Sequence, residues 1–210
     1  MPRFLLIDDH AVVRRGLRQI LAEEYPRAKF EEASDGNEAL KLLGAKPWDL
    51  VLLDVCLPGM SGLDVLKQIR QHWPKTPVLA LSYYPESLYG IRTLRSGAAG
   101  YVTKQCAPEI LAGAVKKVLA GGKYVSPALA ERLADDLGSG NDKPPHQALS
   151  NREHAILRLL GAGKRLTEIA EELSLSPKTV GTYRARILEK MKMRTNAQLM
   201  RYALDYGLVE

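Results

Sequence analysis

The sequence predicts an α/β domain, built on a five-stranded parallel sheet with helices on both faces, followed by a smaller all-α domain. Five short strand-like runs alternate with amphipathic stretches, a polar break follows residue 137, and only helical patterns come after it. The chain of 210 residues is long enough for two hydrophobic cores, because domains commonly hold about 100–150 residues.

The strand-like runs define the first domain. They are Phe4-Ile7, Lys29-Ala33, Leu50-Leu53, Val78-Leu81 and Gly100-Val102. Runs without strict polar alternation predict strands that are covered on both faces, as in a parallel sheet between two helix layers. Right-handed crossovers through the intervening helices would make this sheet doubly wound.

A polar stretch at about residues 138–147 predicts the linker between the domains. It holds serine, asparagine, aspartate and two successive prolines. The prolines have no backbone N–H and therefore cannot donate backbone hydrogen bonds. Before it, Ser126-Pro127 predicts a capped helix through Leu137. We therefore expect a first domain over residues 1–125, a connecting helix and linker over 126–147, and a second domain over 148–210.

Four helices are expected in the second domain. Ser150 with Glu153 forms a capping-box pattern, Ser176-Pro177 starts a third helix, and Thr195 caps a fourth. The apolar residues expected to face the core are Ala155, Ile156, Leu159, Leu160, Leu166, Ile169, Ala170, Leu173, Val180, Ile187, Leu188, Met191, Leu199, Tyr202 and Ala203.

Positive charge gathers in the C-terminal part of the chain. Residues 1–137 hold 18 basic and 16 acidic side chains, whereas residues 148–210 hold 11 and 7. Residues 176–201 include seven basic residues, and Glu189 is the one acidic residue in this range. This excess suggests a polyanion partner, although a solvated basic face would have the same composition.

Cysteine content and hydropathy indicate the cellular compartment in which the protein is expected. Cys56 and Cys106 show no zinc-binding spacing and no disulfide framework, which fits a reducing cytoplasm. The N-terminus becomes acidic too early for a signal peptide, and no apolar run approaches about 18 residues, the length that predicts a spanning helix. We expect a soluble cytoplasmic protein without a membrane partner.

Acidic residues follow two of the predicted strands. Asp8-Asp9 ends the first and Asp54 ends the third, and the carboxyl ends of parallel strands meet at one edge of the sheet. Three carboxylates in one crevice call for a cation, and their hard oxygen ligands suit Mg²⁺. A carboxylate in such a site can attack phosphorus, while Ser82 and Lys104, which follow later strands, can contact the phosphoryl oxygens.

Four motifs at these strand ends resemble the receiver domain of response regulators, over about residues 1–125. They are Ile7-Asp8-Asp9-His10, Asp54 followed by Leu57-Pro58-Gly59-Met60-Ser61-Gly62, Ser82, and Tyr101-Val102-Thr103-Lys104. The resemblance implies a flavodoxin-like fold in which Asp54 accepts a phosphoryl group from a sensor histidine kinase. It further implies that Lys104 contacts this phosphoryl group and that Ser82 and Tyr101 form a switch pair. Asp8 or Asp9 would bind Mg²⁺ together with Asp54 and the main-chain carbonyl of Cys56.

Each of these residues also has a purely structural interpretation. Asp8 could cap a helix, Ser82 could belong to a turn, Lys104 could be a surface charge, and Tyr101 could be a strand aromatic. Their joint occurrence in order favours the chemical interpretation. His10 is interpreted as a helix-start residue and the Cys56 side chain as a packing residue. Gln105 stands where many receivers carry proline, which argues against a cis peptide after Lys104.

A helix-turn-helix is predicted in the second domain, from a helix over about residues 166–173 and a helix that starts at Pro177. The polar face of the later helix would enter the major groove of double-stranded DNA. Its candidate DNA contacts are Lys178, Thr179, Thr182, Tyr183, Arg184 and Arg186.

Three segments resemble the LuxR/NarL-type effector domain: Leu149 to Glu153, Glu168 to Ala170, and Leu175 to Val180. With the receiver motifs, they identify the chain as a member of the NarL/FixJ family of response regulators. The resemblance implies that the segment Thr195 to Leu204 forms a homodimer contact. Gly181 departs from the lysine that is common there, so base specificity cannot be carried over.

The main hypothesis is a DNA-binding regulator in which phosphorylation controls dimerisation or domain release. It is not a dedicated enzyme, although autodephosphorylation is expected. One rival is a Mg²⁺-dependent phosphohydrolase, which the adjacent Asp8 and Asp9 disfavour, because such enzymes usually carry an Asp-x-Asp pattern. Another is a phosphorylation-independent DNA binder, which the complete set of Asp9, Asp54, Ser82 and Lys104 disfavours.

Overall fold

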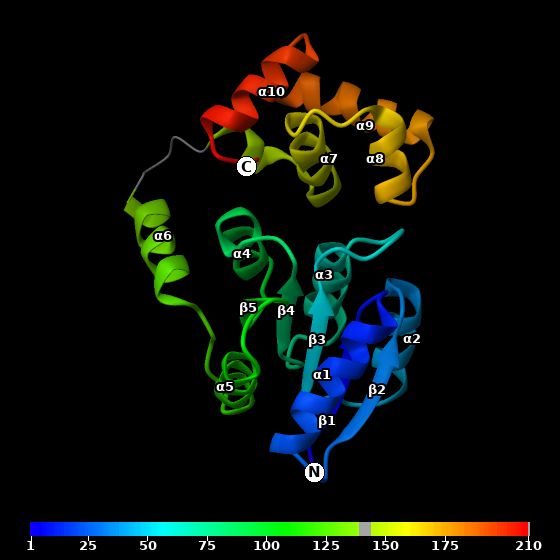
Figure 1. Ribbon diagram of the computed structural model, residues 1–210, viewed down its shortest axis with the longest axis vertical. Coiled ribbons are helices and arrows are strands. Elements are labelled where there is room, and N and C mark those ends of the chain that lie inside the picture. Colours follow the sequence, from blue (N-terminus) through cyan, green and yellow to red (C-terminus); the bar gives the residue numbers. More distant parts are fainter. Residues whose placement is uncertain (139–143, 210) are drawn as a thin grey trace. The chain divides into compact units, whose positions relative to one another are not determined.

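The structure is a computed structural model that describes residues 1–138 and 144–209 of the chain. These residues form two compact units, Met1–Asp135 and Asp136–Glu210. The first unit contains the whole sheet and the second is helical (Figure 1). Each unit has its own hydrophobic core, so they are described separately.

The first unit is a five-stranded parallel sheet with the strand order β2-β1-β3-β4-β5. The strands are β1 (Arg3–Ile7), β2 (Lys29–Ala33), β3 (Leu50–Asp54), β4 (Val78–Ser82) and β5 (Gly100–Thr103). The helices between and after them are α1 (Ala11–Glu24), α2 (Gly36–Ala45), α3 (Gly62–His72), α4 (Glu86–Arg95) and α5 (Pro108–Leu119). The predicted doubly wound α/β fold is confirmed.

Two hydrophobic clusters explain why the strands lack alternation. Leu5 and Val51 face the cluster made with α2, α3 and α4, whereas Phe4 and Leu52 face the cluster made with α1 and α5. The sheet is therefore apolar on both faces, as its continuous runs predicted. β2, which lies at one edge and has a lysine and two glutamates, is the least buried strand.

The loop after β3 passes very close to the strand it leaves. The Gly62 N–H donates to the carbonyl of Val55 at 3.0 Å. A Cβ on Gly62 would lie 1.9 Å from the Asp54 carbonyl oxygen, which is far inside any van der Waals contact. Only glycine fits at this position, and its presence fixes the backbone that carries Asp54.

Helix α6 (Pro127–Gly138) begins against α4. The Ser126 hydroxyl accepts from the Leu129 N–H at 3.1 Å and donates to a Glu86 carboxylate oxygen at 2.6 Å. The Leu129 side chain is fully buried over Gly90, where a Cβ would lie 2.7 Å from it. The predicted helix start at Ser126 is confirmed, and the start of this helix packs as part of the first unit.

The second unit holds a short 3₁₀ helix and four α-helices. They are η1 (Pro145–Ala148), α7 (Asn151–Gly161), α8 (Leu166–Glu172), α9 (Pro177–Lys190) and α10 (Asn196–Asp205). The four predicted helices and the caps at Ser150, Ser176 and Thr195 are confirmed. The predicted linker instead contains η1 and the last residue of α6, and its residues 139–143 lie outside the described part of the chain.

Helix α7 is buried on more sides than its apolar stripe predicted. Arg152, Glu153, His154 and Arg158 are all buried, because α7 contacts α8, α9 and α10 together. Burial alone would raise the pKa of Glu153, but an ion pair with Lys190 at 2.7 Å and hydrogen bonds from Ser150 lower the pKa below its ordinary value. Lys190, one of the basic residues of the second unit, therefore also stabilises its fold.

Gly181 is a weak point within α9. It lies in the middle of the helix, and a Cβ there would meet nothing within 4 Å. We expect Gly181→Ala to stabilise the second unit by about 0.5–1 kcal/mol, because alanine loses less backbone entropy in a helix. Amide hydrogen exchange along α9 of the full chain measures this change locally.

The exposed Ala185 on the same helix provides the reverse control. Ala185→Gly should cost a similar free energy. An α9 that exchanges faster in Gly181→Ala than in the unaltered protein would contradict the prediction.

Candidate functional site

Three charged side chains meet at the carboxyl edge of the sheet. Lys104 Nζ lies 2.6 Å from Asp8 Oδ2 and 2.7 Å from Asp54 Oδ2. The side chains of Asp8, Asp54 and Lys104 are 0%, 1% and 3% exposed. The structure therefore brings together residues from the ends of β1 and β3 and from the segment after β5, as the parallel topology predicted.

Backbone groups fix both carboxylates. Asp54 Oδ1 accepts from the Cys56 N–H at 2.9 Å, and Asp8 Oδ1 accepts from the His10 N–H at 2.9 Å. The Arg14 guanidinium donates to the main-chain carbonyl of Asp8 at 2.6 Å. Each aspartate therefore has one oxygen held by the main chain and the other directed at the Lys104 ammonium.

The electrostatic balance of the site is unusual. Burial raises the pKa of Asp54, although Lys104 and the Cys56 N–H act in the opposite direction. Burial alone would lower the pKa of Lys104, but the charges of Asp54 and Asp8 and hydrogen bonds to them raise it. Lys104 thus stays cationic, and its charge makes the ionised form of Asp54 tolerable in a buried place.

An acidic pocket adjoins the contact between Lys104 and the two aspartates. Asp8, Asp9, His10 and Asp54 each offer a ligand atom, and these atoms lie within 4.8 Å of one another. Apart from the Lys104 ammonium, no hydrogen-bond donor among the described residues reaches the buried Asp8 Oδ2. Three carboxylates against one lysine leave an excess of negative charge, so the pocket is compatible with a metal cation.

Ser82 and Tyr101 converge on one residue of the segment between β4 and α4. The Ser82 hydroxyl accepts from the Tyr84 N–H at 3.1 Å, and the buried Tyr101 hydroxyl donates to the Tyr84 carbonyl at 2.7 Å. Ser82 Oγ also lies 3.9 Å from Cys56 Sγ, close to the carboxylate site. The two hydroxyls thus contact the two backbone groups of the same residue.

One prediction at this site is wrong, one residue has contacts beyond its predicted role, and one residue was missed. The Cys56 side chain is exposed and does not pack in the core, because its N–H turns back to Asp54. His10 is the N-cap of α1, as its helix-start interpretation predicted, and it also joins the acidic pocket, with Nδ1 2.8 Å from Asp9 Oδ1. The missed residue is Tyr83, whose ring centroid lies 4.7 Å from Lys104 Nζ. Its only sequence signal is its position directly after Ser82. All described peptide bonds, including the bond after Lys104, are trans.

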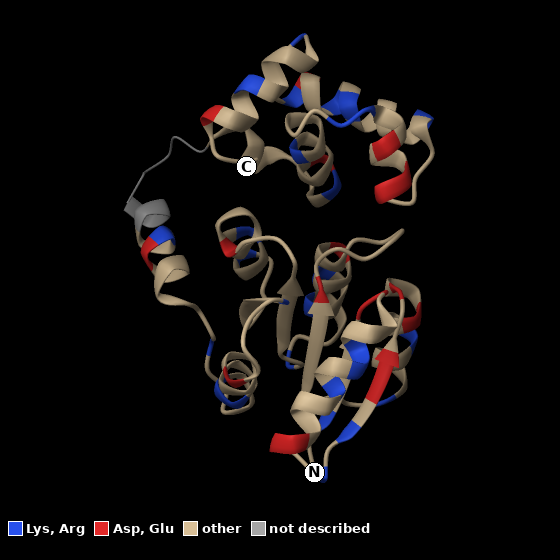
Figure 2. Ribbon diagram, viewed as in Figure 1, with Lys and Arg blue, Asp and Glu red and all other residues tan. Residues whose placement is uncertain are grey.

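The candidate DNA-contacting side chains of α9 differ in exposure. Lys178, Thr182 and Arg186 are exposed, whereas Thr179, Tyr183 and Arg184 are partly buried. Tyr183 packs against the core of the unit, and its ring lies 5.9 Å from the Arg186 guanidinium carbon. Arg184 Nε donates to Asn196 Oδ1 of α10 at 2.5 Å. Basic residues nevertheless recur along α9 (Figure 2).

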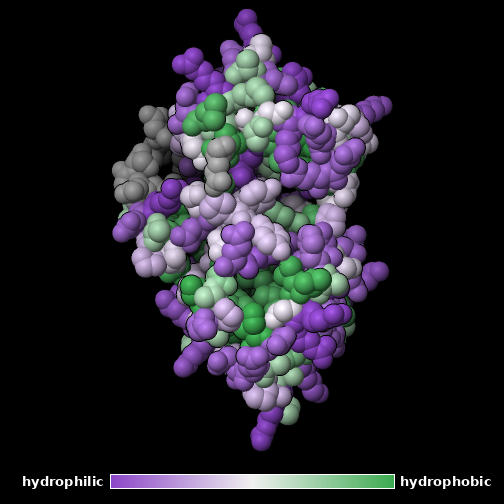
Figure 3. Space-filling view, viewed as in Figure 1, coloured by the Kyte–Doolittle hydropathy of each residue, from purple (hydrophilic) through white to green (hydrophobic). Residues whose placement is uncertain are grey.

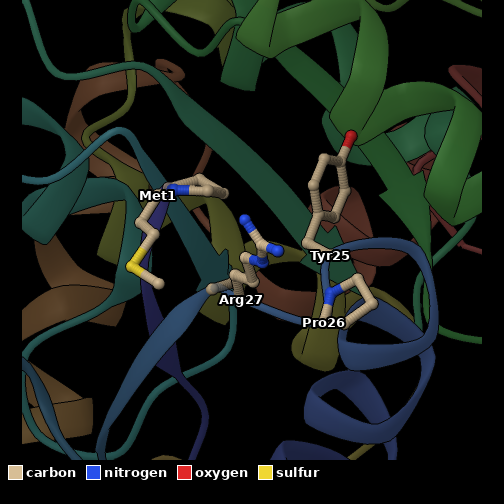
Figure 4. Close-up of a pocket in the computed structure, with 6 residues that line it drawn as sticks. Met1, Tyr25, Pro26 and Arg27 are labelled. Carbon is tan, nitrogen blue, oxygen red and sulfur yellow. The ribbon is translucent and has the colours of Figure 1, made fainter.

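A separate hollow lies at the other end of β1. A hollow of about 400 Å³ lies beside the start of β1, lined by Met1, Pro2, Tyr25, Pro26, Arg27 and Ala28 (Figure 4). It contains no carboxylate and lies at the opposite end of β1 from Asp8. Hydrophilic side chains cover most of the visible face, with small hydrophobic patches between them (Figure 3). Among the described residues, no helix is long and apolar enough to cross a membrane.

A doubly wound parallel sheet with this aspartate and lysine cluster, in a chain that also carries a helix-turn-helix, defines the class of DNA-binding response regulators. Family comparison agrees on both parts. Residues 4–116 match the response regulator receiver domain, and residues 147–203 match the LuxR family of bacterial regulatory proteins.

The chain belongs to the NarL/FixJ family of two-component response regulators. It is 32% identical to the response regulator UvrY of Escherichia coli K12, over 99% of this chain and 96% of UvrY. It is 34% identical to the response regulator GacA of Pseudomonas aeruginosa, over 100% and 99% of the two chains. A solved structure of RcsB from Salmonella typhimurium, described for its conformational dynamism in DNA interaction, matches with a TM-score of 0.58 and 26% identity over 98% of this chain and 100% of that one.

Proposed function

We propose that Asp54 is the phosphoacceptor of this response regulator and that a sensor histidine kinase is its donor. The observation that supports this most is the Lys104 ammonium at 2.7 Å from Asp54 Oδ2, at the carboxyl edge of the sheet. In the transfer, this carboxylate oxygen attacks the phosphorus and the bond from phosphorus to the histidine nitrogen breaks. The bonding electron pair stays on the imidazole, which then takes a proton.

The residues of the acidic pocket fit a magnesium ion. Asp8, Asp9 and Asp54 would hold it, with the main-chain carbonyl of Cys56 as a further oxygen ligand. When bound, Mg²⁺ neutralises the oxygens of the transferred phosphoryl group. Lys104 supplies the second positive charge, by turning from the carboxylates to a phosphoryl oxygen. The same site permits slow autodephosphorylation, in which water releases inorganic phosphate and regenerates the Asp54 carboxylate.

Ser82 and Tyr101 would transmit the phosphorylation state. A phosphoryl group on Asp54 offers a new acceptor to the Ser82 hydroxyl, which now accepts from the Tyr84 N–H. When Ser82 turns away, the loop between β4 and α4 loses this hydrogen bond, and the Tyr101 hydroxyl follows the Tyr84 carbonyl. The surface near α4, on which α6 begins, then changes.

The output step that we propose is dimerisation and binding of double-stranded DNA through α9. Its contacts would come from Lys178, Thr179, Thr182, Tyr183, Arg184 and Arg186, of which Lys178, Thr182 and Arg186 are exposed. Leu204, a 62% exposed leucine on α10, supports the Thr195 to Leu204 segment as the homodimer contact. The proposed division into residues 1–125, 126–147 and 148–210 follows these roles. The proposed partners, a kinase and chromosomal DNA, support a cytoplasmic location for this protein.

A stable phosphoryl mimic tests the coupling. Beryllofluoride with Mg²⁺ should increase self-association of the full chain, measured by light scattering. It should also increase the affinity of the protein for fragmented genomic DNA from the organism that encodes it. Asp54→Ala should show neither change. If beryllofluoride alters neither property in the unaltered protein, the proposed coupling is wrong.

Single basic residues of α9 should account for the salt dependence of DNA binding. Arg186→Ala and Lys178→Ala should each weaken binding to an arbitrary duplex and lower the slope of log affinity against log salt by about 1, because each removes a phosphate contact. Fluorescence anisotropy over a salt series measures this slope. Lys117→Ala, an exposed lysine on α5, should leave the slope unchanged. An unchanged slope in both α9 variants would rule out this face.

A further inference from the structure

Asp54 is almost inaccessible in this structure, which raises the question of how a donor reaches it. The side chain is 1% exposed, one of its oxygens faces Lys104, and the other faces the Cys56 N–H. A nucleophile must approach phosphorus to within about 3–3.5 Å before the bond forms. Some group at the mouth of the site must therefore move before phosphoryl transfer.

Tyr83 is a bulky side chain beside the charged cluster. Its ring centroid lies 4.7 Å from Lys104 Nζ, the same atom that contacts Asp54 Oδ2. The His10 ring meets it edge-on, with 6.4 Å between centroids and an interplanar angle of 83°. Tyr83 is nevertheless 53% exposed. One side of the ring thus faces the charged cluster while the other faces solvent, so the ring can swing out without disturbing the core.

Tyr83 lies next to the residue that both switch side chains contact. It lies between Ser82, whose hydroxyl accepts from the Tyr84 N–H, and Tyr84, whose carbonyl accepts from Tyr101. A change in these two hydrogen bonds would act on the residue directly after the one that carries the ring. The cover over the acceptor is therefore attached to the segment that would respond to phosphorylation.

We propose that Tyr83 is a gate over the phosphoacceptor, which slows both labelling by small phosphodonors and hydrolysis of the acyl phosphate. A cation–π contact with Lys104 and an edge contact with His10 hold the gate closed. This inference rests on the proposed role of Asp54. Because the ring occupies the approach to the site, its removal exposes the carboxylate to a small donor and exposes the phosphorylated product to water.

Both affected reactions take place at the phosphorus atom. With acetyl phosphate as donor, an Asp54 oxygen attacks phosphorus, the bond from phosphorus to the acetate oxygen breaks, and acetate leaves with the electron pair. In hydrolysis, a water oxygen attacks the same phosphorus, the bond to the Asp54 oxygen breaks, and inorganic phosphate leaves with the proton of the water passing to solvent.

The test compares phosphorylation and dephosphorylation rates in the full chain with Mg²⁺, followed by intact mass. Tyr83→Ala should accelerate labelling by acetyl phosphate and loss of the label by about three- to tenfold, the range that corresponds to the loss of a cation–π contact. Tyr83→Phe keeps the ring and should stay within about twofold of the unaltered protein. Tyr206→Ala, which removes a similarly exposed tyrosine from the second unit, should change neither rate.

The outcomes separate this inference from the proposed function. Equal rates for Tyr83→Ala and the unaltered protein, both of them labelled, overturn the gate and leave the role of Asp54 intact. Absence of label in every variant, under conditions that label a control receiver, overturns the proposed function itself. If Tyr83→Ala does not fold, as judged by circular dichroism, Tyr83→Ser takes its place in the same comparison.

Discussion

Replacing Lys104 with methionine should destabilise the first unit by about 3–5 kcal/mol in magnesium-free buffer at neutral pH, the usual cost of removing one partner of a buried ion pair. Asp8 and Asp54 would then face each other without the ammonium that now lies within 2.7 Å of both. Methionine keeps much of the length and apolar surface of the lysine stem, so the loss measures charge more than packing. Urea denaturation followed by tryptophan fluorescence reads the first unit, because Trp48 and Trp73 both belong to it.

Magnesium and acid should each reverse part of this loss. A bound Mg²⁺ replaces the missing positive charge, so the stability of Lys104→Met should rise with Mg²⁺ more steeply than that of the unaltered protein. Burial raises the pKa of Asp54, and a raised carboxyl pKa costs stability above the pKa of the unfolded chain. The deficit should therefore shrink as the pH falls. Lys117→Met is the control, and a deficit that depends on neither Mg²⁺ nor pH would contradict this account.

Gly62→Ala should be the second most damaging of the changes considered. The new Cβ would lie 1.9 Å from the Asp54 carbonyl oxygen, and no side-chain rotation relieves a contact between a Cβ and the main chain. The strand end or the loop must shift, at a cost near the upper end of the about 1–3 kcal/mol that overpacking commonly costs. Because the shifted atoms belong to Asp54 itself, phosphoryl acceptance should fall together with stability.

Gly113 provides a matched comparison. It lies within α5, and a Cβ there would meet nothing within 4 Å. Gly113→Ala should therefore be neutral or stabilising, and it should be labelled by acetyl phosphate at the normal rate. If Gly62→Ala unfolds at the same urea concentration as Gly113→Ala and is labelled as fast, the close approach of the loop matters for neither stability nor phosphoryl acceptance.

The sequence predicted the strands to within a residue at each end, because short apolar runs between helical stretches are compatible with few structures other than buried strands. It also predicted that Asp8, Asp54 and Lys104 meet, because parallel strands place their carboxyl ends together. The helix starts at Ser150, Ser176 and Thr195 could also be predicted, since each cap is a local arrangement of neighbouring residues.

What escaped prediction depends on tertiary packing. The burial of Arg152, Glu153 and Arg158 in α7 follows from three helices that pack around it, which no local pattern records. The exposure of Cys56 follows from the turn that its N–H makes toward Asp54. Tyr83 gave no periodic or motif signal, because its contact is with Lys104, which is distant in sequence.

Phosphoryl acceptance by Asp54 is tested most directly by intact mass spectrometry. The unaltered protein and Asp54→Ala are incubated with acetyl phosphate and Mg²⁺, and then again with a chelator in place of the metal. We predict one phosphoryl adduct on the unaltered protein, which depends on Mg²⁺ and is absent from Asp54→Ala. An adduct of the same size on Asp54→Ala, or no adduct on the unaltered protein under conditions that label a control receiver, would contradict the account.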